Sequence, residues 1–162
     1  MLLFIVALLG ACATRPVAPP EPSLRTQQET VLRNLGFAEV EDGWLMTIAE
    51  PISFDFNEAQ LRDSLRNELL QSARSLLEVR ITQVQCEGHT DNLGARDYNA
   101  TLSLARGRAV ADVFVEAGFV AENVSAIGHA WDYPVESNDT REGRAANRRV
   151  NVIVPMQSLS TP

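Results

Sequence analysis

Three side chains that can bind a metal ion lie close together in the middle of the sequence. Cys86, His89 and Asp91 are all residue types that serve as ligands of transition metals. A tetrahedral site needs a fourth ligand, and no further Cys or His is near in sequence. A cysteine that stands beside Val84 in a strand-like segment is more often a small buried hydrophobic residue. The sequence therefore predicts no metal site and no bound cofactor.

Motifs for catalysis are also absent from the sequence. His129 has no nucleophile motif to pair with, and there is no G-x-S-x-G elbow, phosphate-binding loop or Cys-His cluster. The alternative class, a cell-wall hydrolase, would need a catalytic Glu, zinc ligands or a nucleophile in a cleft, and none stands out in the sequence. We therefore expect a binding protein rather than an enzyme.

The composition excludes one broad class of partner. The chain has 162 residues, of which 45% are hydrophobic and 22% are charged, and this fits one globular domain with a tail. Its net charge is −7 and its pI is near 4.8. Neutralising phosphates requires a surplus of Lys and Arg, so the sequence predicts no nucleic-acid binding and no basic membrane-binding patch.

The N-terminus has the features of a targeting signal. Residues 2–9 form an apolar run that is too short to span a bilayer as a helix but suits the centre of a signal peptide. The run continues into Leu9-Gly-Ala-Cys12, which resembles the lipobox of bacterial lipoproteins. That resemblance implies that residues 1–11 are removed and that lipid on Cys12 anchors the chain to the outer membrane, on its periplasmic face. An uncleaved anchor with an incidental cysteine is the alternative.

Two segments are expected between the lipid and the main domain. Residues 12–25 contain four prolines and should form an extended linker. Within residues 26–50, Thr26 and Glu29 form a capping-box pattern for a short helix. Asp42-Gly43 then predicts a hairpin turn between two strand-like runs. We therefore expect a helix and a hairpin ahead of the domain.

Hydrophobic periodicity predicts one domain over residues 51–155, followed by a tail over residues 156–162. Apolar residues at every second position predict strands, and apolar residues three and four apart predict helices. The expected elements are strands at 52–56, 81–87, 124–128 and 150–154 and helices at 58–78 and 98–117, with a polar loop before the last strand. This β-α-β-α-β-β order implies a two-layer α/β (α+β) sandwich, with helices on one face of a mixed sheet.

Three segments of this domain are specific in their order and spacing. They are Gly88-His-Thr-Asp-Asn-Leu-Gly94, Tyr98-Asn-Ala-Thr-Leu-Ser-Leu-Ala-Arg106 and Asn138-Asp-Thr-Arg-Glu-Gly-Arg-Ala-Ala-Asn-Arg-Arg-Val150. They resemble the OmpA C-terminal-like peptidoglycan-binding domain. The resemblance covers roughly residues 50 to 155 and includes Phe54-Asp-Phe-Asn57. It implies binding of meso-diaminopimelate, the third residue of the peptidoglycan stem peptide.

The same resemblance assigns roles to five residues. Asp91 takes the second ammonium of diaminopimelate, and Arg106 takes its carboxylate, which a guanidinium matches in a bidentate manner. Asn57, Asn99 and Arg148 match positions that add polar contacts. Structural roles stay open for all five. The alternatives are an ion pair between Asp91 and Arg106 and a helix cap for Asn57. Asn99 could be polar filler in a first helical turn, and Arg148 or Arg149 could brace the final strand.

The region ahead of the domain carries a second resemblance. Residues 24–50, with the domain directly behind them, resemble the YfiB family of lipoproteins. That resemblance implies an adaptor that sequesters a periplasmic repressor, YfiR, and so frees the diguanylate cyclase YfiN. Leu32, Phe37 and Trp44 are then candidate partner-binding residues, although they could equally pack on the domain. A purely structural Pal-like tether between outer membrane and cell wall is the alternative function.

Overall fold

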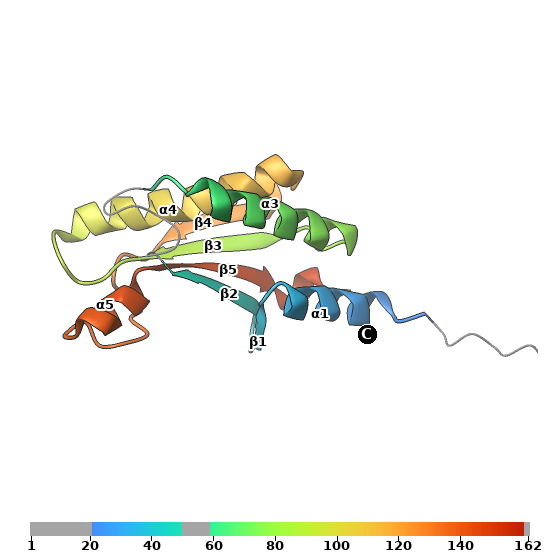
Figure 1. Ribbon diagram of the computed structural model, residues 1–162, viewed down its shortest axis with the longest axis horizontal. Helices are drawn as coiled ribbons and strands as arrows, with labels where there is room; N and C mark the ends of the chain where they lie inside the picture. The colour runs from blue at the N-terminus through green and yellow to red at the C-terminus, as the bar shows by residue number, and fades with distance from the viewer. Residues whose placement is uncertain (1–20, 50–58, 161–162) are drawn as a thin grey trace, which may run out of the picture.

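The computed structural model describes residues 21–49 and 59–160 (Figure 1). Cys12, Asn57 and the strand expected at residues 52–56 lie outside these ranges. The described helices and strands are, in chain order, α1 (Leu24–Asn34), β1 (Ala38–Val40), β2 (Gly43–Ala49), α3 (Asp63–Glu78), β3 (Val84–His89), α4 (Arg96–Ala117), β4 (Val124–Gly128), α5 (Arg141–Asn147) and β5 (Arg149–Pro155). Short 3-10 turns precede β4, at Ala121–Asn123, and follow β5, at Met156–Ser158.

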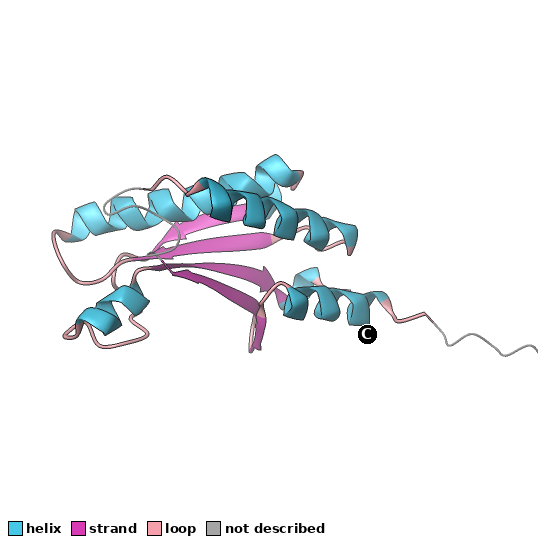
Figure 2. Cartoon of the chain, viewed as in Figure 1, coloured by secondary structure: helices cyan, strands magenta, loops and turns pink. Residues whose placement is uncertain are grey.

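The described strands form one mixed sheet in the order β1-β2-β5-β3-β4. β3 and β4 run parallel, whereas the other neighbouring strands run antiparallel. α3 and α4 lie side by side over one face of the sheet (Figures 1 and 2). The expected two-layer arrangement, with a mixed sheet and helices on one face, is confirmed.

The hydrophobic core lies between this sheet and the two helices. On β5, Val150, Val152 and Val154 face the helices and are fully buried, as their alternating spacing predicts. The buried helix residues of the same core are Leu69, Ala73 and Leu76 of α3 and Val110 and Phe114 of α4. Removing this apolar surface from water contributes roughly 25 cal/mol per Å² to folding. The core therefore fixes both helices on the sheet.

Two glycines let α4 lie directly against the strands. A Cβ atom on Gly88 of β3 would overlap the carbonyl oxygen of Ser103, and one on Gly128 of β4 would overlap the backbone of Leu104. Any larger residue at either position would push the helix away from the sheet. The side chains that α4 carries are therefore held at a fixed height above β3 and β4.

Two local predictions are wrong. The first helix starts three residues earlier than expected, because the hydroxyl of Ser23 accepts the N–H of Thr26 at 3.2 Å and caps it. The stretch expected to be a polar loop contains α5. In α5 only Gly143 and Asn147 are buried, so it lacks the apolar stripe from which a helix is predicted.

The hairpin expected ahead of the domain forms the edge of the sheet itself. β2 pairs with β5 along its whole length. On its inner side Trp44 and Ile48 are buried against the core. A turn signal predicts where a hairpin bends, but it does not predict which other strand the hairpin pairs with. Residues 26–50 were therefore expected to be a segment separate from the domain.

α1 is joined to the rest of the fold by a buried amide. Gln28 is 1% exposed, and its Nε2 donates to the carbonyl oxygen of Val79 at 2.9 Å. Its Oε1 accepts the N–H of Ser160 at 2.9 Å. The beginning and the end of the described chain are therefore fixed at one corner of the molecule.

The three residues predicted as a partner surface lie in this corner. Leu32 is 0% exposed, Phe37 is 4% exposed and Trp44 is 1% exposed, and all three belong to the core. Large apolar side chains stabilise the fold most when they are removed from water. In this fold they are therefore packing residues, as the alternative interpretation had it, and a partner cannot reach them.

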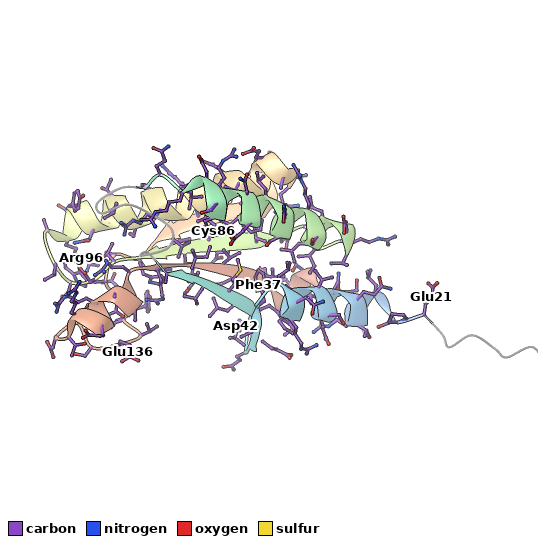
Figure 3. The ribbon with its side chains drawn as sticks, in the orientation of Figure 1. Glu21, Phe37, Asp42, Cys86, Arg96 and Glu136 are labelled. Atoms are coloured by element: carbon purple, nitrogen blue, oxygen red, sulfur yellow. The ribbon has the colours of Figure 1, made fainter. Side chains whose placement is uncertain are left out.

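The two ends of the molecule carry different parts of the chain. In Figure 3, Glu21 lies at the end near α1, while Arg96 and Glu136 lie at the opposite end near α5. The chain thus enters the fold far from the loops that follow β3 and β4.

Within the two described ranges, no helix is both long enough and apolar enough to cross a membrane.

Candidate functional site

Most of the candidate residues gather where β3 ends, on the side of the molecule that carries α5 (Figure 1). The loop after β3 is tied to the loop after β4, because the N–H of Thr90 donates to the carbonyl oxygen of Ala130 at 2.7 Å. Ser103 of α4 braces the same point, where its hydroxyl accepts the N–H of Ala130 at 3.0 Å. The loop that carries Asp91 is therefore held by a helix and by a neighbouring loop.

Asp91 is the acidic centre of this site and is 7% exposed. Its Oδ1 accepts the N–H of Leu93 at 3.0 Å, and its Oδ2 accepts a hydrogen bond from Nη1 of Arg148 at 2.8 Å. A carboxylate offers about four acceptor positions, so a ligand ammonium can add to these two bonds. The structure thus brings together two of the predicted site residues that are 57 positions apart in the sequence.

Asn99 and Arg106 lie two turns apart on the buried face of α4 and are 4% and 2% exposed. Nδ2 of Asn99 donates to the carbonyl oxygens of Leu93 at 2.8 Å and Ala95 at 3.2 Å. Asn99 therefore shapes the loop beside the acidic centre. The sequence left open an ion pair between Asp91 and Arg106, and in the structure the ion pair of Asp91 is made with Arg148.

Asn147 is a central residue of this site that the sequence did not single out. It is fully buried at the end of α5. Its Oδ1 accepts the N–H groups of Val135 and Glu136 at 2.8 and 3.1 Å. Its Nδ2 donates to the carbonyl oxygen of Glu136 at 2.8 Å and to Oδ1 of Asn138 at 3.0 Å. Asn138 also accepts the N–H of Asn92 at 3.4 Å, so this network reaches the loop of the acidic centre.

Arg149 takes a bracing role at the start of β5. Its guanidinium is buried and donates to the carbonyl oxygens of Asn147 at 3.2 Å and Tyr133 at 3.1 Å. Burial lowers the pKa of Arg149, and the nearby carboxylate of Glu87 opposes that shift. The two neighbouring arginines therefore have different roles. Arg149 binds backbone carbonyl oxygens, whereas Arg148 binds the carboxylate of Asp91.

The described side chains offer no metal centre. Within residues 21–49 and 59–160, no three His, Cys, Asp or Glu side chains are grouped so that they could hold a metal ion. Cys86 is fully buried, and burial raises the pKa of its thiol to about 12. A thiol must be deprotonated to bind a metal, so Cys86 is a packing residue.

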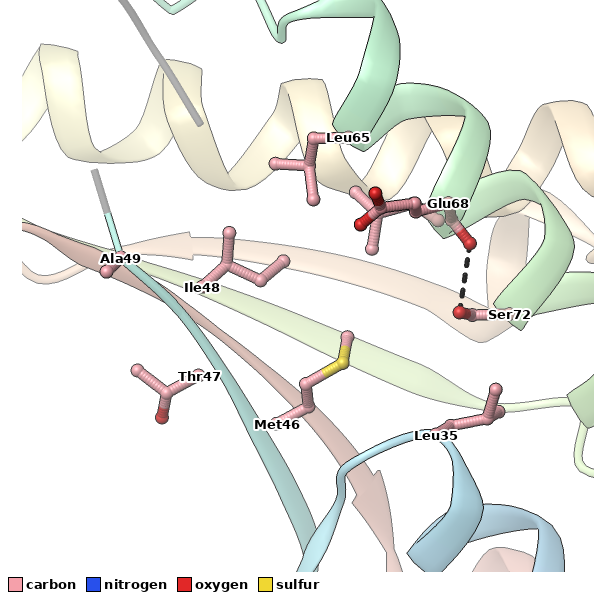
Figure 4. Close-up of a pocket in the computed structure, with 9 residues that line it drawn as sticks. Leu35, Met46, Thr47, Ile48, Ala49, Leu65, Glu68 and Ser72 are labelled. Carbon is pink, nitrogen blue, oxygen red and sulfur yellow. Dashed lines mark hydrogen bonds between the residues drawn. The ribbon is translucent and has the colours of Figure 1, made fainter. Parts of the chain in front are cut away.

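A second hollow lies away from this site, between β2 and α3 (Figure 4). It encloses about 250 Å³, and most of its lining is apolar, including Met46 and Leu65. Glu68 is the only ionisable residue among its described lining, and its carbonyl oxygen accepts a hydrogen bond from the Ser72 hydroxyl at 2.9 Å. This hollow lacks the paired charges found around Asp91.

Comparison with known proteins identifies the family. The model of the OmpA family matches residues 53–148, which contain the acidic centre and its partners. The chain belongs to the OmpA family. The outer-membrane lipoprotein YfiB of Pseudomonas aeruginosa is 41% identical to it over 156 residues, which cover 96% of this chain and 91% of that protein. The putative lipoprotein YfiB of Escherichia coli is 31% identical over 94% of this chain and 93% of the relative.

The fold of this OmpA-family chain is also that of a solved structure. The cell wall anchor of the T6SS from Pseudomonas aeruginosa superposes with a TM-score of 0.65 at 31% sequence identity. The superposition covers 83% of this chain and 97% of that one. Because the matches to both YfiB proteins run over nearly their whole length, the similarity includes α1 and the hairpin as well as the sheet.

Proposed function

We propose that this protein is an outer-membrane lipoprotein that binds peptidoglycan at the Asp91 site and acts as a YfiB-like adaptor. Its ligand is the meso-diaminopimelate residue of the stem peptide, whose second amino and carboxyl groups carry opposite charges. Asp91 receives the ammonium and Arg106 the carboxylate. Further polar contacts come from Asn57, Asn99 and Arg148.

The observation that carries the wall-binding proposal is the fixed position of the Asp91 carboxylate. It is buried and bonded on two sides, so it is oriented before a ligand arrives. An ammonium that joins it adds a charge-assisted hydrogen bond, which contributes roughly 1.5 to 3 kcal/mol. The name of the similar solved structure, a cell wall anchor, supports the same use of this fold.

Arg106 supplies the opposite charge from the buried face of α4. A guanidinium stays charged at any physiological pH and matches a carboxylate with two parallel hydrogen bonds. Because the Arg106 side chain is only 2% exposed, Arg106→Ala should reduce folding stability as well as ligand binding. Arg106→Lys keeps the positive charge but cannot form two parallel hydrogen bonds with a carboxylate. It therefore separates the effect on ligand binding from the effect on folding stability.

Co-sedimentation with purified cell walls tests the role of Asp91. Asp91→Asn keeps the shape of the side chain but removes its charge, and we expect at least a roughly tenfold loss of affinity. Asp132→Asn is the matched control, because Asp132 is an exposed carboxylate at the same end, bonded to Arg96 at 2.7 Å. Equal retention of Asp91→Asn and wild type on the walls would refute the assignment.

Soluble wall fragments test the chemistry of the ligand. A lysine-type stem lacks the side-chain carboxylate, so it cannot form the bidentate bond with Arg106. Sites built for a polar group reject analogues that lack it. We expect the diaminopimelate-type fragment to bind at least about tenfold more tightly. Equal affinity for the two fragments would rule out this pairing.

The adaptor part of the proposal is supported by the similarity to YfiB proteins over nearly the whole chain. Lipid on Cys12 would hold the protein at the outer membrane, where it faces a periplasmic YfiR-like repressor. Strand β1 is exposed along its length, including Glu39 and Val40, whereas the apolar residues behind it are buried. We therefore assign the partner contact to β1 and the outer side of α1.

Two measurements test the adaptor. Cys12→Ser should release the protein from the membrane fraction, and full-length protein that stays bound would refute the lipid anchor. A periplasmic pull-down with Val40→Asp should recover less repressor than wild type, while cell-wall binding is unchanged. If wild type recovers no partner although it binds walls, the purely structural Pal-like tether replaces the adaptor.

A further inference from the structure

The face of the sheet that α3 and α4 leave uncovered carries a polar pocket outside the Asp91 site. It encloses about 380 Å³ and is lined by Glu87 and His89 of β3, His129 and Tyr133 from the loop after β4, and Arg149 and Asn151 of β5. Strand register explains the grouping. Glu87 pairs with Asn151 across the two strands. His89 pairs with Arg149, and side chains at alternate positions share one face.

One wall of this pocket is aromatic. Tyr133 is 62% exposed, and its ring meets that of His129 edge to face, with the ring centres 4.9 Å apart. His129 stacks in turn on His89 at 5.1 Å. Nε2 of His129 lies 3.5 Å from a carboxylate oxygen of Glu87. A flat aromatic wall beside a few polar groups is typical of sites that bind small polar molecules.

One polar atom of the lining lacks a partner. His89 is 3% exposed, and its Nδ1 is buried with no hydrogen-bond partner among the described residues. Leaving such an atom unpaired lowers the stability of the fold. Burial, with the charge of Arg149 and the nearby His129, lowers the pKa of His89 to about 4, so the ring is neutral at pH 7. The neutral ring therefore adds no charge to the pocket.

The charges of the lining favour a neutral ligand. Arg149 and Glu87 carry opposite charges, and Arg149 already donates to two backbone carbonyl oxygens. A carboxylate or phosphate ligand gains little from a pocket whose charges cancel. Hydroxyl and amide groups can bond to the carboxylate of Glu87 and the amide of Asn151. A pyranose ring combines such groups with an apolar C–H face that fits an aromatic ring.

We propose that this pocket binds the sugar from which the stem peptide extends, that is, the glycan strand of peptidoglycan. This proposal rests on the wall-binding function above. The pocket adjoins the Asp91 site, because His89 precedes Asp91 by two residues, a separation of roughly 7 Å, and Arg149 follows Arg148 directly. Three extended residues of a stem span roughly 10 Å. A single wall unit therefore reaches both sites.

Calorimetric titration of the full chain in detergent tests the pocket with three ligands. They are the free tripeptide stem, the same tripeptide joined to the glucosaminyl-muramyl disaccharide, and the disaccharide alone. We expect the joined ligand to bind at least about tenfold more tightly than the tripeptide, because the second contact becomes intramolecular. Tyr133→Ala should reduce this ratio to about one and leave the tripeptide affinity unchanged.

Tyr98→Ala is the matched control. Tyr98 is also an exposed tyrosine, at 49%, but it lies on α4 and does not line the pocket, so its removal should leave the ratio intact. A ratio near one in the wild type, or a ratio that Tyr133→Ala does not change, would overturn the proposal. If the disaccharide binds and the tripeptide does not, the stem-peptide function fails while the pocket assignment stands. If no ligand binds, both fail.

Discussion

The two ends of the sheet are held together by different kinds of interaction. At the α1 end, Leu32, Phe37 and Trp44 are buried in a continuous apolar core. The buried amide of Gln28 adds two hydrogen bonds there. At the α5 end, the buried amide of Asn147 and the ion pair of Asp91 join the loops after β3 and β4 to the end of α5 through hydrogen bonds. Apolar contact has no preferred direction, whereas each hydrogen bond fixes an angle as well as a distance. The end proposed to orient a ligand is therefore the one built mainly from directional bonds.

The same contrast separates attachment from recognition. The chain enters the fold at the α1 end, where Glu21 lies opposite the Arg96 end of the molecule (Figure 3). Tension on a lipid-anchored linker would act on the apolar end, and contacts with the wall would act on the polar end. Each end can then be altered without the other, provided that the core between them stays folded.

The largest effect should come from Trp44→Ala at the apolar end. Truncating a fully buried tryptophan costs about 3 to 5 kcal/mol of unfolding free energy. Trp44→Phe is the control and should cost less than about 1.5 kcal/mol, because the buried Nε1 of Trp44 has no hydrogen-bond partner among the described residues. Urea unfolding measures both. Cell-wall binding, measured well below the unfolding transition, should stay at the wild-type level, and a loss there would show that the ends are coupled.

Asn147→Ala should have the next largest effect, at the polar end. It removes four hydrogen bonds from a fully buried site, and we expect a loss of about 2 to 4 kcal/mol. Unlike Trp44→Ala, it should also weaken cell-wall binding, because Asn147 positions the loop before α5 and directly precedes Arg148. Asn34→Ala is the control, since Asn34 is exposed at the apolar end. Normal wall binding by folded Asn147→Ala would contradict the division of tasks.

Acid should act on the polar end, because His89 is a base that the fold keeps neutral. Burial lowers its pKa from 6.5 to about 4, so between these values the folded protein binds fewer protons than the unfolded chain. The free energy of unfolding should therefore fall as the pH drops from about 6.5 to about 4, by about 1 to 3 kcal/mol. Urea unfolding at several pH values should show a flatter dependence for His89→Gln. Equal slopes for variant and wild type would refute this origin.

The spacing of apolar residues correctly predicts those helices and strands that bury one face. The strand of Val150, Val152 and Val154 and the long helix α4 lie where apolar spacing placed them. The sequence assigned Gly88 and His89 to a loop because glycine and polar residues are typical of turns, yet both belong to β3. Gly88 is required there by the close approach of α4, which no local pattern reveals.

The position of Asp91 was predictable from the sequence, but its contacts were not. Asp91 lies in the loop where it was expected, and the family-like segments contain its partner. The bond from Arg148 to Asp91 joins residues that are distant in sequence, so only the packed sheet determines it. Asn147 has no distinguishing pattern, because a buried asparagine and a solvated one look alike in sequence. The pocket around His89 depends on strand register in the same way.

The smallest effects should come from the loss of two helix caps. One cap lies at each end of the molecule, so the two changes are closely matched. The hydroxyl of Ser23 caps α1 by accepting the N–H of Thr26 at 3.2 Å, and the hydroxyl of Thr140 caps α5 by accepting the N–H of Gly143 at 3.0 Å. Replacing either by alanine should cost about 0.5 to 1 kcal/mol, because each change leaves one N–H of a first turn without its partner. Amide hydrogen exchange should show faster opening only of the helix whose cap is lost.

Cell-wall affinity should nevertheless fall about two- to fivefold for Thr140→Ala alone, since α5 carries Asn147 and leads directly into Arg148. Equal loss of wall affinity for Ser23→Ala would mean that the two ends respond as one unit, and the distinction between attachment and recognition would then be wrong.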